Sequence, residues 1–87
     1  MASYELVFKK SVAKDLRGFP KQDVKRILLR IRSLADDPRP PGCEKLSGQE
    51  RYRVRQGAYR IVYAIEAARL IVLIVKVGHR REAYRRN

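Results

Sequence analysis

The side chains best suited to chemistry are arginines that alternate with apolar residues in the second half of the chain. Four of them lie close together in the sequence: Arg51, Arg53, Arg55 and Arg60. A guanidinium group binds phosphate through paired hydrogen bonds and stays charged at physiological pH. Alternation along a β-strand places every second side chain on one face of a sheet. We therefore expect a basic sheet face that binds a polyanion, and RNA is the polyanion that we favour.

These arginines lie on two segments that predict a β-hairpin. Pairing Arg55 with Arg60 leaves residues 56–59 in the loop. This register sets apolar residues opposite one another: Val54 opposite Ile61, and Tyr52 opposite Tyr63. A shift by one residue would put a charge on the core side. Like charges in directly opposed positions are destabilising, so the Arg55–Arg60 pair is a local conflict that a phosphate site would explain.

Length and charge narrow the class of protein. The 87 residues suffice for a single domain, 1–87, with a small core. The net charge is +12, from 21 basic and 9 acidic residues. Residues 51–87 alone hold ten basic and two acidic residues, a net charge of +8. A field of one sign attracts nucleic acid, and we also expect an acidic protein partner that neutralises it.

Cysteine and histidine are too few for an internal disulfide or a metal cluster. Cys43 is the one cysteine and His79 the one histidine, so we expect no internal disulfide and no zinc site. We also expect no cofactor. The apolar run 70–75 is far too short to span a membrane, and no secretory leader is apparent. We expect a cytoplasmic protein.

The elements that must position the arginines come before and after them. Residues 4–8 predict a strand, and residues 10–18 a short helix with Val12, Leu16 and Ala13 facing inward. Gly18 ends this helix and Pro20 opens the next. The second helix has an apolar stripe: Val24, Ile27, Leu28, Ile31 and Leu34.

The rest of the chain predicts one more strand and a tail. Residues 36–42 hold three prolines and a glycine, which predicts a stiff connector, and residues 43–50 predict a polar loop. Residues 70–75 are apolar on both faces, as in a central strand. The tail from 79 to 87 predicts a helical turn.

In this order of elements the chain resembles the RelE/ParE superfamily of bacterial and archaeal toxins. The resemblance covers nearly the whole length and is carried by three segments: 52–55, 57–63 and 77–84. It implies an α+β fold with a two-helix hairpin packed on a small, antiparallel-rich, four-stranded sheet (β-α-α-β-β-β) and a short C-terminal helical tail. It also implies a cognate antitoxin that wraps the toxin and silences it.

The two branches of the superfamily imply different activities. The RelE branch implies a ribosome-dependent endonuclease that cleaves mRNA in the A site by metal-independent attack of the 2′-OH. The ParE branch implies a gyrase inhibitor without nuclease residues. A catalytically inactive RNA- or ribosome-binding module is a third interpretation. We favour the first, because the arginine cluster and the segment from Gly78 to Tyr84 suit a phosphate site.

The resemblance also implies roles for single residues. Arg60 matches the arginine that contacts the scissile phosphate, and Arg80 the arginine that stabilises charge or protonates the leaving oxygen. Tyr84 matches the tyrosine that stacks on the substrate nucleotide. Arg53 and Arg55 match a basic pair that is commonly lysine, and arginine cannot readily act as a base. Further substrate-binding candidates are Arg51, Arg81 and Arg85.

Cleavage of RNA without a metal needs a group that takes a proton and a group that gives one. His79 can do either near neutral pH, although a lone histidine is also often structural. Glu50 and Glu82 are alternative bases, although Glu82 also suits an ion pair with neighbouring arginines. The sequence leaves the identity of the base open.

Overall fold

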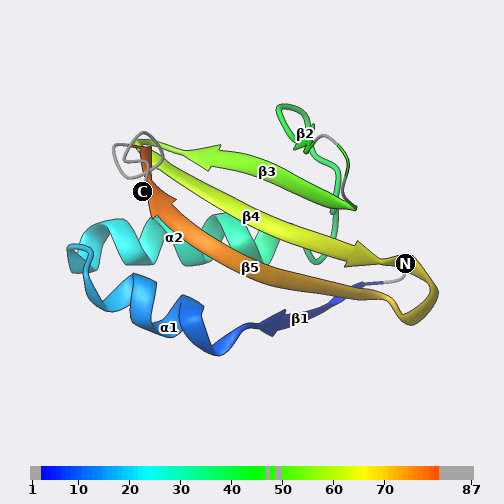
Figure 1. The fold of residues 1–87 in the computed structure, drawn as a ribbon, viewed down its shortest axis with the longest axis horizontal. Coiled ribbons are helices and arrows are strands. Elements are labelled where there is room, and N and C mark those ends of the chain that lie inside the picture. The colour runs from blue at the N-terminus through cyan, green and yellow to red at the C-terminus, as the bar shows by residue number, and fades with distance from the viewer. Residues whose placement is uncertain (1–2, 47, 49, 81–87) are drawn as a thin grey trace.

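The structure, a computed structural model, describes residues 3–46, 48 and 50–80 (Figure 1). Its strands are β1 (Glu5–Phe8), β2 (Glu44–Lys45), β3 (Arg51–Gln56), β4 (Tyr59–Glu66) and β5 (Ile71–His79). Its helices are α1 (Lys10–Arg17), α2 (Lys21–Ser33) and the short 3-10 helix η1 (Ala67–Arg69). The strands form one sheet in the order β1-β5-β4-β3-β2, and α1 and α2 lie together on one side of it.

The predicted α+β class, a helix pair on an antiparallel-rich sheet, is confirmed. Only β1 and β5 are parallel, and the other neighbouring strands are antiparallel. The predicted number of four strands is wrong, because β2 adds a fifth strand within the segment expected to be a loop. Two residues are too few to show the alternation that marks a strand. The predicted helical tail lies outside the described residues. None of the described helices is long and apolar enough to cross a membrane.

The helices bury a narrower stripe than their sequences indicate. In α1, Val12 is buried while Ala13 is exposed, so the inward orientation expected for Ala13 is wrong. The α2 stripe is buried at Ile27, Ile31 and, just past the helix, Leu34. Leu28, expected in that stripe, is 41% exposed, because it lies about 100° around the helix from Ile27.

The hairpin register is the one that the sequence predicts. Arg55 pairs with Arg60, Val54 with Ile61 and Tyr52 with Tyr63. The loop is shorter than expected, because Gln56 also pairs with Tyr59 and leaves only residues 57 and 58 in the turn. Gly57 takes a φ of 59° there, a conformation that glycine adopts without steric penalty. The hairpin is therefore tight, and its two strands stay paired up to the turn.

The central strand β5 contains an irregularity at Val75. Val62 pairs with Lys76 and Tyr63 pairs with Ile74, so Val75 is an extra residue between them. Asp15 of α1 contacts the strand just after this extra residue: its carboxylate accepts a hydrogen bond from the Val77 backbone N–H at 3.2 Å. The same carboxylate lies 3.7 Å from the Lys76 ammonium group. The bulge changes which residues of β5 share a face with the arginines.

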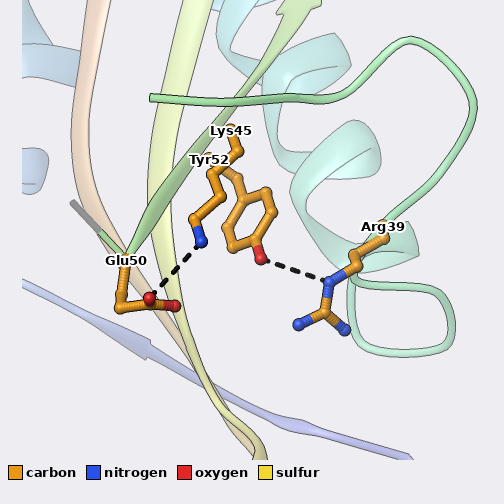
Figure 2. Close-up of polar contacts among 4 residues, drawn as sticks. All are labelled: Arg39, Lys45, Glu50 and Tyr52. Carbon is orange, nitrogen blue, oxygen red and sulfur yellow. Dashed lines mark hydrogen bonds and ion pairs between the residues drawn. The ribbon is translucent and has the colours of Figure 1, made fainter. Parts of the chain in front are cut away.

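Tyrosines fasten the proline-rich connector to the sheet. The buried Tyr63 hydroxyl donates a hydrogen bond to the Pro38 carbonyl oxygen at 2.7 Å, and burial raises the pKa of Tyr63 above its ordinary value. The Tyr52 ring stacks on the Tyr63 ring, with ring centroids 5.9 Å apart. Arg39 donates to the Tyr52 hydroxyl at 3.3 Å, as Figure 2 shows, and this hydrogen bond raises the pKa of Arg39. The connector thereby holds the start of β2 beside β3.

Candidate functional site

The four sequence-predicted arginines share the sheet face that lies opposite the helices. Directly paired residues of antiparallel strands project to the same side, and Arg55 pairs with Arg60. Arg51 pairs with Ala64 and Arg53 with Val62 by the same register. We call this side, which carries Arg51, Arg53, Arg55 and Arg60, the arginine face. The helix-side face carries the buried tyrosines and aliphatic residues of both strands instead.

A cavity of about 220 Å³ opens on the arginine face beside Arg60. The residue that pairs with Arg60 across the β4–β5 boundary is Gly78, which has no side chain to fill the space. The cavity is lined by Leu46, Arg53, Arg60, Val62, Lys76, Gly78 and His79. Apolar walls with a few basic groups suit a ligand that carries one anionic group.

The cavity selects two of the four arginines. Arg53 and Arg60 are half-buried and line it. Arg55 is exposed and Arg51 half-buried on the same face, and neither lines the cavity. Arg53 also forms an ion pair with Glu44, its partner across the β2–β3 boundary. Arg60 and Arg53 are therefore the two of the four that line the cavity, and Arg55 and Arg51 lie on the same face outside its lining.

His79 lies where β5 ends, between two cavities. It pairs with Tyr59 in the sheet, and the two rings meet edge to face with centroids 5.3 Å apart. A second cavity of about 270 Å³, next to the N-terminal half of α2, is lined by Asp23, Arg26, Gln56, Gly57, Ala58, Tyr59 and His79. His79 borders the arginine-face cavity, but its pairing with Tyr59 and the contact between the two rings place its imidazole on the helix-side face.

The Tyr59 ring that contacts His79 is itself firmly held. Its hydroxyl donates a hydrogen bond to the Asp23 carboxylate of α2 at 2.6 Å. Its ring packs against Phe19 with centroids 4.7 Å apart. These contacts tie helix α2 to the strand end that carries His79.

The remaining predicted residues lie at the end of the described chain. Arg80 is exposed, and its backbone N–H donates to the Ala58 carbonyl oxygen at 2.7 Å, so the start of the tail is tied to the hairpin turn. Arg81, Tyr84 and Arg85 lie outside the described residues, as does Glu82. Glu50 is exposed and forms an ion pair with Lys45 at 3.4 Å (Figure 2).

Three residues near the cavity were missed by sequence reasoning: Leu46, Lys76 and Glu44. Lys76 stands two positions before Gly78, so alternation counted back from Gly78 would have placed it beside Arg60. Leu46 and Glu44 belong to the segment expected to be a loop, where no periodicity marks a face. Among residues 3–46, 48 and 50–80, no group of three histidine, cysteine or acidic side chains is placed to hold a metal ion.

The sequence and the fold both match known toxins. Residues 6–84 match the family described as ParE toxin of the type II toxin–antitoxin system parDE. The RelE1 protein of Methanocaldococcus jannaschii is 32% identical over 80 residues, which cover 87% of this chain and 89% of that protein. The archaeal RelE–RelB complex from Pyrococcus horikoshii contains a chain that is 30% identical, with a TM-score of 0.80 and coverage of 90% of this chain and 96% of that chain.

The RelBE2 complex of Mycobacterium tuberculosis extends the likeness of the fold to bacteria. A chain of that complex has a TM-score of 0.82 at 23% identity, with coverage of 91% of this chain and 93% of that chain. The family match spans most of the sequence, and the M. jannaschii relative is of nearly the same length. The protein therefore belongs to the RelE/ParE superfamily of type II toxin–antitoxin toxins.

Proposed function

We propose that this toxin is a ribosome-dependent endonuclease that cleaves mRNA in the A site. The observation that carries the proposal is the cavity beside Gly78, where Arg60 and Arg53 stand with Lys76. Cationic donors fixed around one small space suit a phosphate group whose charge grows in the transition state. Since ribosomes translate in the cytoplasm, the proposed activity belongs there.

The proposed reaction is an attack of the 2′-oxygen on the adjacent phosphorus. The 2′-OH loses its proton as the new P–O bond forms, and the bond to the 5′-oxygen breaks as that oxygen gains a proton. The products are a 2′,3′-cyclic phosphate, which can open to a 3′-phosphate, and a 5′-hydroxyl. Arg60 and Arg53 contact the phosphate oxygens in this scheme, and Arg80 stabilises the charge at the leaving oxygen.

Proton transfer in this scheme falls to His79, with Tyr84 stacking on the substrate base. His79 lines the edge of the cavity and is the one imidazole in the sequence, and in this step its ring turns from its contact with Tyr59 toward the substrate. Arginine holds its proton too tightly to serve as the base. Arg51, Arg55, Arg81 and Arg85 add sequence-independent contacts to the RNA backbone in this proposal.

We propose an acidic antitoxin as the protein partner. The P. horikoshii structure is that of an archaeal RelE–RelB complex, and this protein resembles one chain of it. A net charge of +12 on 87 residues gives an acidic partner a strong electrostatic attraction.

A non-enzymatic gyrase inhibitor is the second candidate function. The family match favours it, because the family that residues 6–84 match is described as ParE toxin, and the ParE branch implies gyrase inhibition. The basic cavity favours the nuclease, since a protein that only blocks gyrase has no need of a phosphate site at Arg60. An inactive RNA- or ribosome-binding module would keep the arginine face but lose cleavage.

The test compares variants in a translating extract that holds a defined mRNA, with primer extension to map cuts. We expect the wild type to cut in frame and Arg60→Ala to lose about 10²–10³ in rate. Arg69→Ala is the matched control, because Arg69 is an exposed arginine on η1 that pairs with Glu66 and lies outside the cavity. A parallel supercoiling assay with gyrase covers the second candidate.

Each outcome assigns a function. Cuts that vanish in Arg60→Ala and persist in Arg69→Ala support the nuclease. Inhibition of gyrase without cuts would replace it with the gyrase inhibitor. Binding of the ribosome with neither effect would leave the inactive module.

A further inference from the structure

The Glu44 carboxylate sits on one of the two arginines that line the cavity. The β2–β3 register pairs Glu44 directly with Arg53, so both side chains project to the arginine face. The two form an ion pair in which the Arg53 side chain is 18% exposed and the Glu44 side chain 63% exposed. The Glu44 carboxylate is therefore an anion of the protein itself that is bound to the Arg53 guanidinium group of the candidate phosphate site.

An incoming phosphate would compete with that carboxylate. Arg53 lines the same cavity as Arg60 and Lys76, so a phosphate held by these groups would lie next to Glu44. The carboxylate already takes N–H donors of the Arg53 guanidinium that a phosphate would use, and two anions held close together on one cation repel one another. Full engagement of Arg53 by phosphate thus requires the carboxylate to turn away.

The structure lets Glu44 turn away without loss of the fold. Glu44 stands on an edge strand of two residues, and its side chain is mostly in solvent. The β2 segment has other anchors: the Leu46 N–H donates to the Arg51 carbonyl oxygen at 2.7 Å, and Lys45 pairs with Glu50 at 3.4 Å (Figure 2). An ion pair with an exposed partner is weak, so its exchange for a phosphate is readily reversible.

We propose that Glu44 is an anion gate, a side chain that blocks Arg53 in the empty site and is displaced when an RNA phosphate binds. The choice of RNA as the displacing anion rests on the proposed function. The gate lowers the affinity of the cavity for any single phosphate. Binding then depends on additional contacts along a longer RNA, which the other cations of the arginine face supply.

The test measures RNA affinity with cleavage removed from the experiment. The probe is a short, fluorescently labelled 2′-O-methyl RNA, which lacks the attacking hydroxyl, and the readout is anisotropy at salt concentrations from about 50 to 200 mM. We expect Glu44→Gln to bind about two- to fivefold more tightly than the wild type, the factor that corresponds to loss of a weak ion pair. We also expect its salt dependence to steepen by up to about 0.7 in log–log slope, since one more cation meets the RNA.

Two controls separate the gate from a general charge effect. Glu50→Gln removes the same charge from an exposed residue that pairs with Lys45 outside the cavity, and it should give less than half of the gain. In an Arg53→Gln background, Glu44→Gln should give no more than the gain of Glu50→Gln, because only the general effect of the lost charge remains.

Several outcomes would overturn the gate. They are weaker or unchanged binding by Glu44→Gln, an equal gain for Glu50→Gln, a full-sized gain for Glu44→Gln in the absence of Arg53, or no RNA binding by the wild type and Glu44→Gln alike. Loss of cleavage with unchanged affinity would instead assign Glu44 to proton transfer. If Glu44→Gln passes these tests while no mRNA is cut, the gate stands and the proposed nuclease fails. If the wild type cuts mRNA but Glu44→Gln binds RNA with unchanged affinity, the nuclease stands and the gate fails.

Discussion

The two faces of the β3–β4 hairpin come from the same alternating sequence but differ in the residues that they pair across the strands. On the helix side, paired residues are apolar or aromatic and buried: Val54 with Ile61, and Tyr52 with Tyr63. On the other side, Arg55 meets Arg60, a like-charge pair, and Arg60 meets the bare backbone of Gly78. One face gains stability from each pair, and the other gives some up.

The helix-side residues of the hairpin stabilise the fold, whereas the arginine face carries the candidate site. A like-charge pair across two strands costs roughly 0.2–1 kcal/mol, which is tolerable only because the helix-side face is well packed. Variants on the helix side should therefore change the free energy of unfolding, and variants on the arginine face should change activity. Four substitutions, at Ile61, Arg60, Tyr63 and Arg55, test this separation.

Ile61→Ala should destabilise the fold by about 2–5 kcal/mol, because it leaves a void between Val54 and Val77 at a fully buried position. Urea denaturation followed by circular dichroism measures the free energy of unfolding. The graded control is Ile61→Val, for which we expect about 0.5–1.5 kcal/mol. A loss below 1 kcal/mol for the alanine variant would mean that the helix-side face is not the main source of stability.

Arg60→Ala should reduce mRNA cleavage by about 10²–10³, equivalent to about 2.7–4 kcal/mol of transition-state stabilisation. The same variant should change the free energy of unfolding by about 1 kcal/mol or less, because Arg60 lies on the arginine face and its removal relieves the repulsion with Arg55. Primer extension and urea denaturation on one preparation measure both quantities. A variant that unfolds as readily as Ile61→Ala would break the separation of the two faces.

Tyr63→Phe should cost about 1–3 kcal/mol, because it removes the hydroxyl that satisfies the buried Pro38 carbonyl oxygen. Thermal or urea unfolding measures the loss. A neutral effect would show that the connector is held by packing alone.

The same variant has a pH signature. Burial raises the pKa of Tyr63 above its ordinary value of 10.0, so the unfolded chain releases this proton before the folded protein does. The stabilisation that Tyr63 contributes is therefore fully present below pH 10 and declines as the pH rises above it. The difference in free energy of unfolding between wild type and Tyr63→Phe should therefore shrink as the pH rises above 10. A constant difference would contradict burial as the cause.

Arg55→Thr should stabilise the protein by up to about 1 kcal/mol, because it removes the charge opposite Arg60 and places a β-branched residue in a strand. Arg51→Thr is the matched control: Arg51 faces Ala64, so its replacement relieves no direct repulsion. Urea denaturation distinguishes the two. Equal effects would attribute the gain to strand propensity or to net charge.

The hairpin shows how much the sequence alone can specify. Its register follows from matching apolar residues, and the structure has the predicted pairs Arg55–Arg60 and Val54–Ile61. The arginine face follows from that register alone, because a strand has a fixed period of two. The cavity does not, since it depends on Gly78 arriving beside Arg60 from another strand.

Three features of β5 explain why the position of Gly78 beside Arg60 could not be predicted from the sequence. The run from Leu70 to Val75 is apolar throughout, so no alternation reveals the extra residue at Val75. Leu70, expected to begin the strand, instead has a φ of 54° at the end of η1. The strand also extends to His79, beyond the apolar run 70–75 from which it is predicted. Pairing with β1 and β4 and the Asp15 contact decide these points, and none of them is local in sequence.

The parallel pairing of β1 with β5 joins the first strand of the chain to the last. Residues 5–8 have no strand to pair with until residues 71–74 have been made. At typical synthesis rates of about 5–20 residues per second, an 87-residue chain takes about 4–17 s to complete. For most of that time the nascent protein lacks a finished sheet and the cavity at Gly78. The order of synthesis thus delays formation of the β1–β5 pairing and of the cavity beside Gly78 until residues 71–78 have been made.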